Sequence, residues 1–134
     1  MTKLVDIEGV GLVYAEKLRK AGIRGTGDLL KKGATPKGRL EIEKASGIGH
    51  KLILEWVNHV DLFRIKGVAS EYSDLLEEAG VDTVVELSKR DPKKLVATMA
   101  DVSQKKDLTR RIPNEKMVKN WIAQAKKLPR AISY

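Results

Sequence analysis

The chain repeats itself, and this repetition limits the available folds more than any other feature. Residues 6–23 align with residues 64–81, so that a glycine, a tyrosine, a leucine and an Ala-Gly pair recur at matching places. Residues 49–63 align in the same way with residues 114–128, and each copy contains one tryptophan. The second copy also carries extra residues between its aligned parts, in the lysine-rich stretch SQKKDLT. We therefore expect two related structural units within one chain.

Both copies have the periodicity of α-helices. Apolar side chains recur at positions i, i+1, i+4, i+5 and i+8 and form one stripe on a helix, whereas no segment sustains a period of two. We expect an all-α fold in which two pseudo-repeats, residues 1–64 and 65–134, pack through a shared long helix. The expected helices are 2–8, 12–21, 26–32, 36–45, 50–64, 70–79, 83–89, 92–101 and 115–127.

Local signals agree with these helix boundaries. Thr35-Pro36 and Asp91-Pro92 each place a capping residue before a proline, and a proline at the first helical position loses no hydrogen bond. Asn114 is a third capping residue. Gly22 and Gly80 suit the left-handed backbone conformation that commonly ends a helix.

The composition excludes several functional classes. The chain has no cysteine, which rules out disulfides, thiolate zinc sites and thiol nucleophiles. It also has no apolar run near the roughly 18 residues of a membrane span and no secretory leader, so we expect a cytoplasmic protein. We expect no bound cofactor and no enzymatic activity, because dinucleotide, Walker and nucleophile-elbow motifs are missing.

The net charge of +8 makes polyanions plausible partners, although excess lysine also serves solubility. Residues 105–134 hold nine Lys and Arg residues against only two acidic ones. Lys105, Lys106, Arg110 and Arg111 are expected to lie on one exposed segment.

Two glycine turns stand at expected helix starts, Gly9-Val10-Gly11 and Gly47-Ile48-Gly49. Two glycines around one apolar residue allow a tight turn whose middle side chain returns to the core. The next helix begins with unpaired N–H groups and the positive end of its dipole. Because Cβ atoms are missing there, an anion such as a backbone phosphate can approach those donors.

The segments IEGVGLVYAEKL and ASGIGHKLILEW resemble helix-hairpin-helix motifs. Two such hairpins joined by a connector helix at 26–32 resemble the paired helix-hairpin-helix domain of DNA repair and recombination proteins. Nearly the whole chain is similar to an uncharacterised bacterial family of tandem helix-hairpin-helix proteins, catalogued as a domain of unknown function. The resemblance implies a duplicated helix-hairpin-helix (SAM-like) bundle.

The resemblance also implies a set of nucleic-acid-binding residues. The donors would be the N–H groups of Gly11 and Leu12 in the first hairpin, and those of Gly49 and His50 in the second. With the other turn glycines, an adjacent lysine and the basic side chains of the second copy, the predicted set is Gly9, Gly11, Leu12, Gly47, Gly49, His50, Lys51, Arg110, Arg111 and Lys116.

The four turns are not expected to contribute equally. The second copy departs from the motif, because Gly67-Val68-Ala69 keeps one glycine and Ile112-Pro113-Asn114 keeps none. Near the first hairpin Asp6, Glu8 and Glu16 would repel phosphate. The hairpin at residues 47–49 is therefore the preferred contact.

The remaining candidate residues indicate structure rather than chemistry. Trp56 and Trp121, with Tyr14 and Tyr72, are expected to pack in the core rather than stack on bases. His59 is expected on a solvated helix face, and no metal site is expected. Two hypotheses remain: binding of DNA or RNA without sequence preference, or a protein-interaction adaptor without nucleic-acid contact. The sequence leaves the oligomeric state open.

Overall fold

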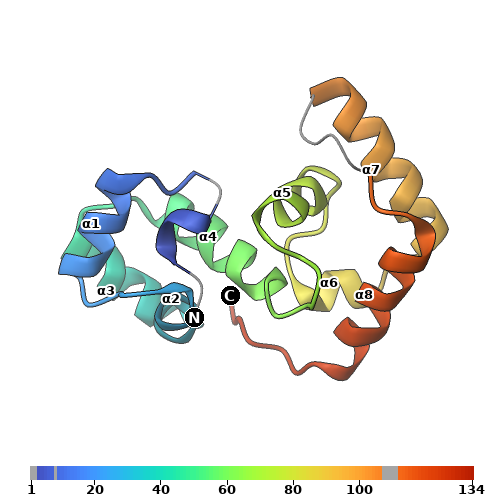
Figure 1. Cartoon of the computed structure of the whole chain (residues 1–134). Coiled ribbons are helices and arrows are strands. Elements are labelled where there is room, and N and C mark those ends of the chain that lie inside the picture. The colour runs from blue at the N-terminus through green and yellow to red at the C-terminus, as the bar shows by residue number, and fades with distance from the viewer. Residues whose placement is uncertain (1–2, 8, 107–111) are drawn as a thin grey trace. The chain divides into compact units, whose positions relative to one another are not determined.

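The computed structural model describes residues 3–7, 9–106 and 112–134 of the chain. These residues form helices and no strand (Figure 1), which confirms the expected all-α fold. The helices are η1 (Leu4–Asp6), α1 (Leu12–Lys20), α2 (Thr26–Gly33), α3 (Pro36–Ser46), α4 (His50–Leu62), α5 (Ser70–Glu78), α6 (Val84–Ser88), α7 (Pro92–Lys106) and α8 (Glu115–Lys127).

The predicted caps are present at the helix starts. The side chain of Thr35 accepts a hydrogen bond from the amide of Gly38 at 3.0 Å, and that of Asp91 accepts from Lys94 at 3.0 Å. Asn114 caps α8 by accepting from the amide of Met117 at 2.8 Å. Each cap satisfies a backbone donor that the helix itself leaves unpaired.

Two helix predictions differ from the structure. Of the expected helix 2–8, the described residues form only the short 3₁₀ helix η1, which ends at Asp6 because Ile7 has an extended backbone. Helix α7 runs five residues beyond its predicted end at 101, because no glycine or proline interrupts the sequence there. Lys105 therefore lies on a regular helix.

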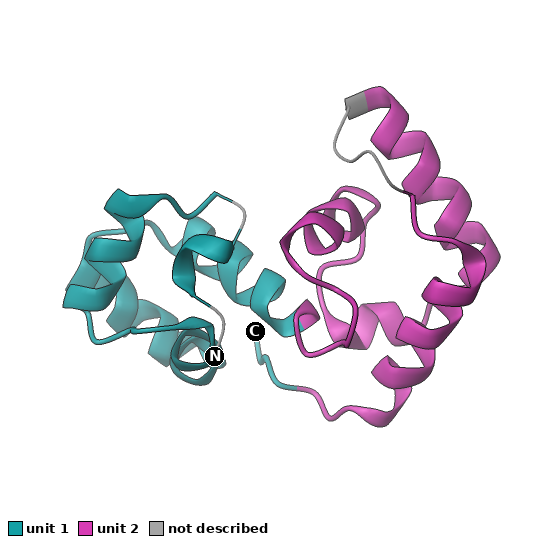
Figure 2. Ribbon diagram, viewed as in Figure 1, with its two compact units in different colours: residues 1–61, 131–134 teal, residues 62–130 magenta. Residues whose placement is uncertain are grey.

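The chain divides into two compact units (Figure 2). Unit 1 comprises residues 1–61 together with 131–134, and unit 2 comprises residues 62–130. In unit 1, α3 packs against both α1 and α2; in unit 2, α6 and α7 both pack against α8. Among the described residues, no helix combines the length and the apolar character that a membrane crossing requires.

Matched residues make matched contacts in the two units. The ring of Tyr14 lies 5.1 Å from that of Trp56, and the ring of Tyr72 lies 5.2 Å from that of Trp121. Both tryptophans are buried, which confirms the prediction that they serve packing. Gly22 and Gly80 both have positive φ, about 90°, immediately after α1 and α5, as expected for helix ends.

The last four residues complete unit 1 rather than unit 2. The amide of Ser133 donates to the carbonyl of Ala34 at 2.8 Å, and the Tyr134 hydroxyl donates to Oδ1 of Asn58 at 3.2 Å. The buried guanidinium of Arg39 donates to the carbonyls of Gly33 and Ser133, each at 2.8 Å. Burial lowers the pKa of Arg39 below its usual value, but the group keeps its charge and joins α3 to this terminal segment.

Candidate nucleic-acid interface

The first hairpin presents an open helix start. Gly9 has positive φ, Val10 points into the core, and Gly11 is the N-cap of α1. Gly11 has no side chain that could cap the helix, and the described residues supply no other acceptor for the amides of Leu12 and Val13. Leu12 is 78% exposed and Val13 is 70% exposed, so solvent and ligands reach this helix start freely.

The acidic residues near the first hairpin are partly engaged. The carboxylate of Asp6 accepts from the amide of Lys3 at 3.1 Å, and that of Glu16 pairs with Arg19 at 3.4 Å. Glu8 lies outside the described residues. The repulsion of phosphate expected from Glu16 is therefore offset by a neighbouring cation, although both side chains are exposed and solvent screens their charges.

The second hairpin has the predicted turn geometry. Gly47 adopts φ +75° and ends α3, and its amide donates to the carbonyl of Glu43 at 2.8 Å. The side chain of Ile48 is buried, as a residue that anchors the turn in the core should be. Gly49 and His50 are exposed at the start of α4, and Lys51 follows on the surface.

A carboxylate already occupies one predicted donor of the second hairpin. Oε2 of Glu43 accepts from the backbone amide of His50 at 2.9 Å and lies 3.4 Å from Nδ1 of the same histidine. This contact places a negative charge where a phosphate would bind, and it is favourable in itself because the start of a helix attracts anions. A phosphate at this hairpin must displace Glu43, so the first hairpin offers the less obstructed donors.

Neither Gly11 nor Gly49 is required by the fold. A Cβ atom built at either position meets nothing within 4 Å, and neither residue has positive φ. By contrast, a Cβ at Gly33 would lie 2.5 Å from Cγ2 of Val57, and one at Gly38 would clash with the carbonyl of Lys32. The missing side chains at 11 and 49 therefore leave open space outside the molecule, beside the first amides of α1 and α4.

The basic side chains predicted in the second copy are only partly described. Arg110 and Arg111 lie outside the described residues. Lys116 is exposed in the first turn of α8, without an ion pair among the described residues. Lys105 instead pairs with Asp101 at 3.1 Å, which weakens the case for a uniformly basic segment. Lys116 belongs to unit 2, whereas both glycine hairpins belong to unit 1.

The prediction for His59 is wrong. This side chain is only 1% exposed, and its neighbour Asp61 is buried as well. Helix α4 thus buries residues outside its apolar stripe, although Lys51 and Glu55 on the same helix remain exposed. Burial lowers the pKa of His59 to about 4, because a charged imidazole there would lose its hydration.

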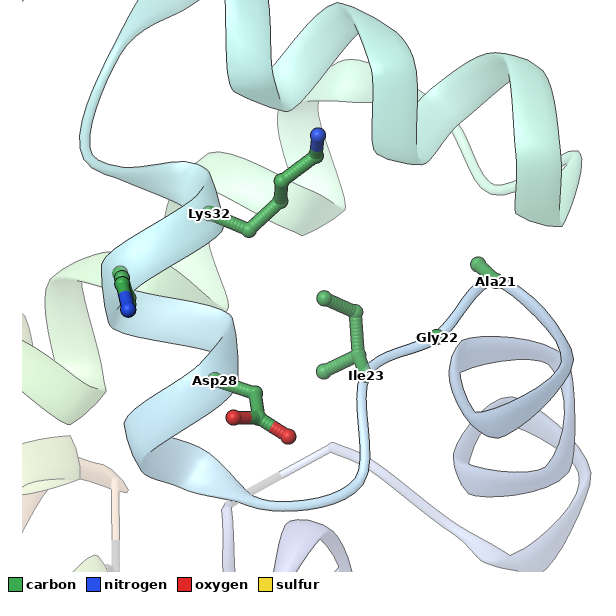
Figure 3. Close-up of a pocket in the computed structure, with 6 residues that line it drawn as sticks. Ala21, Gly22, Ile23, Asp28 and Lys32 are labelled. Atoms are coloured by element: carbon green, nitrogen blue, oxygen red, sulfur yellow. The ribbon is translucent and has the colours of Figure 1, made fainter.

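A pocket of unit 1 lies between the end of α1 and helix α2 (Figure 3), and it has a volume of about 460 Å³. Its lining mixes the carboxylate of Asp28, which accepts from the amide of Arg24, with the cations of Lys31 and Lys32. Lys32 also bonds to Glu41 on α3. The pocket therefore presents both signs of charge and does not favour one class of ligand.

Sequence comparison assigns the chain to a family. A domain of unknown function (DUF4332) matches residues 8–128, which is most of the chain and spans both units. The chain belongs to the DUF4332 family. No curated protein and no solved structure matches it significantly. This match confirms the expected membership in an uncharacterised family, and it does not test the helix-hairpin-helix resemblance. Membership in the family assigns no activity.

Proposed function

We propose that the chain binds the phosphate backbone of nucleic acid, most simply duplex DNA, without reading the base sequence. The contacts are backbone amides at the starts of α1 and α4, in turns that act as helix-hairpin-helix motifs within a duplicated bundle. The observation that carries the proposal is the pair of helix starts at Gly11 and Gly49, where a Cβ atom would meet nothing within 4 Å; Glu43 covers the amide of His50 at the second of them.

Physical chemistry supports this use of the two turns. A helix start concentrates unpaired N–H groups and about half a positive charge, and it binds phosphate without contact to a base. The net charge of +8 attracts a polyanion toward the protein. The first hairpin binds more readily, because Glu43 must leave His50 before the second can bind. The proposal places the protein in the cytoplasm, where such a partner is available.

The test is a fluorescence-anisotropy titration of labelled random-sequence duplex at two salt concentrations. Binding should weaken steeply as salt rises, because each neutralised phosphate releases counterion. Gly11→Val and Gly49→Val should each weaken binding while helical content stays near normal, because a Cβ atom at either position has open space around it and neither residue has positive φ. Ala69→Val is the matched control, since Ala69 begins α5 at the place that corresponds to Gly11 and already carries a Cβ. Equal affinities for all four proteins would refute the hairpins as the contact.

The alternative function, a protein-interaction adaptor, is favoured by one specific observation. Leu12 and Val13 expose large apolar side chains side by side at the start of α1, and Leu40 on α3 is also exposed. Exposed apolar side chains that cluster on a surface commonly mark protein contacts. An adaptor would retain its partner after nuclease treatment and would show no salt-dependent affinity for DNA.

A further inference from the structure

Unit 2 contains a pocket of about 360 Å³. Of the residues that line it, only Lys116 belongs to the predicted nucleic-acid-binding set. It lies where the turn after α4 meets the beginning of α8. The residues that matter for its chemistry are Lys66, Gly67, Asn114, Lys116, Asn120 and Trp121. All of them belong to unit 2.

The charge around this pocket has one sign. Lys66 comes from the turn and Lys116 from the first turn of α8, and neither ammonium group has an ion-pair partner among the described residues. No acidic side chain of the described chain lines the pocket. The nearby carboxylate of Glu115 lies 3.7 Å from Nζ of Lys119 instead. Two unpaired cations from separate segments around one concave surface attract an anion.

Hydrogen bonds hold the two sides of the pocket together. Gln124 on α8 accepts from the amide of Lys66 at 2.8 Å and donates to its carbonyl at 3.1 Å. The same Gln124 amide donates to Oδ1 of Asn120 at 2.8 Å. Since that bond uses the oxygen of Asn120, its Nδ2 group remains a donor. The turn that carries Lys66 is thus fixed to α8, and the pocket exists before any ligand arrives.

The indole of Trp121 supplies a further hydrogen-bond donor at the pocket. This side chain is only 2% exposed, yet its Nε1 makes no hydrogen bond within the described part of the chain. The nitrogen lies against Gly67, because a Cβ built there would come within 3.1 Å of it. The indole nitrogen is not among the fully buried side-chain atoms that lack a partner, so it is not sealed from solvent. Its N–H can therefore donate to an acceptor that enters the pocket, which Trp121 helps to line.

The first repeat has different chemistry at the matching places. The same alignment pairs Lys66 with Glu8 and Asn120 with Glu55, so the sequence of unit 1 has two acidic residues where unit 2 has a lysine and an amide. The two units therefore share a sequence pattern without sharing these basic and amide side chains. The basic character of the pocket belongs to the sequence of unit 2.

We infer that this pocket of unit 2 binds a phosphate group through the ammonium groups of Lys66 and Lys116, the side-chain amide of Asn120 and the indole N–H of Trp121. The inference extends the phosphate chemistry of the proposed function to unit 2, but it uses side chains rather than hairpin amides. The phosphate belongs either to a nucleic-acid strand or to a free phosphate ion, and both present the same acceptor oxygens.

The indole N–H signals in ¹H–¹⁵N NMR spectra test the inference directly, because the chain has only two tryptophans. Two probes are titrated separately into the full chain: inorganic phosphate and random-sequence duplex DNA. The Trp121 signal, assigned from its loss in Trp121→Phe, should shift with at least one probe. A response to both probes identifies a general phosphate site, and a response to DNA alone identifies a strand phosphate.

Paired variants separate the pocket from general electrostatics. Lys66→Gln/Lys116→Gln should lower the affinity for the responding probe about tenfold, because two charge-assisted contacts are lost. Lys93→Gln/Lys94→Gln removes the same charge from the start of α7 and should change the affinity less than about twofold. Equal losses in the two variants would overturn the inference.

The two proposals fail in distinguishable ways. If DNA binds but the Trp121 signal does not move and the pocket variant binds normally, the pocket inference is wrong and the hairpin proposal stands. If phosphate moves the Trp121 signal but DNA does not bind, the proposed function is wrong and the pocket inference stands. If neither probe moves the signal, the inference is overturned.

Discussion

Replacing Gly11 with serine should make the protein more stable and a weaker binder of nucleic acid. Gly11 is the N-cap of α1 and has φ −87° and ψ −174°, an extended conformation that serine adopts without strain. A serine hydroxyl there would accept a hydrogen bond from an amide in the first turn of α1. Glycine has no side chain, so this hydrogen bond is absent in the unaltered protein. Serine also reduces the conformational freedom of the unfolded chain. Together these effects amount to about 0.5–1 kcal/mol of added stability.

The same change should weaken binding, because the new hydroxyl takes a donor that a phosphate needs and fills the space beside it. Hydrogen bonds to charged groups contribute about 1.5–3 kcal/mol. Losing one should reduce the affinity for duplex DNA by about tenfold or more. A gain in stability combined with a loss of binding is expected if glycine at this N-cap leaves the amides of the helix open to a ligand.

Two measurements on one preparation check this expectation: urea unfolding followed by circular dichroism, and anisotropy with labelled duplex at low salt. Ala69→Ser is the matched control, because it adds the same cap to α5, where the sequence does not predict a phosphate contact. The control should gain about 1 kcal/mol and keep its affinity. If Gly11→Ser is stabilised and binds DNA like the unaltered protein, the amides of α1 are not the contact.

Three further changes have defined outcomes. Glu43→Ala removes the carboxylate from the start of α4, so DNA affinity in the anisotropy assay should rise several-fold while stability falls by about 0.5 kcal/mol; unchanged affinity would show that the second hairpin does not bind. Arg39→Met removes two 2.8 Å hydrogen bonds, including the one to Ser133, and should cost about 2–4 kcal/mol in urea unfolding and speed amide exchange in residues 131–134. His59 has a pKa of about 4 in the folded protein and of 6.5 in the unfolded chain. Acid therefore protonates the unfolded chain first, so the free energy of unfolding is at its full value above pH 6.5 and decreases as the pH falls toward 4. By pH 5 the loss should be about 2 kcal/mol, and His59→Gln, which places there the residue type found at the matching position of unit 2, should remove that part of the pH dependence of urea unfolding.

Most helix positions could be predicted from the sequence because their signals are local. A proline after Thr35, a capping Asn114 and a glycine after α1 each act within a few residues of the backbone that they shape. The stripe of apolar residues on α4 likewise predicted the burial of Trp56. Such signals operate within one or two helical turns, so they can be read from the order of residues alone.

The burial of His59 could not be predicted in this way. The sequence shows which face of α4 is apolar, but it does not show how many other segments cover that helix. A polar residue beside the apolar stripe becomes buried when the chain covers a wider arc of the helix than the stripe itself. The apolar pattern of the helix does not give the width of the arc that other segments cover.

The sequence by itself determined the all-α fold, the repeated pattern, the helix caps and the two glycine turns, because each depends on neighbouring residues and backbone preferences. Only the tertiary structure decided which helix starts are open. It placed Glu43 at the amide of His50, residues 131–134 on Arg39, and the indole of Trp121 beside Gly67. These contacts join residues from different elements, and some join segments far apart along the chain. Their distances are fixed by packing, which no local pattern in the sequence records.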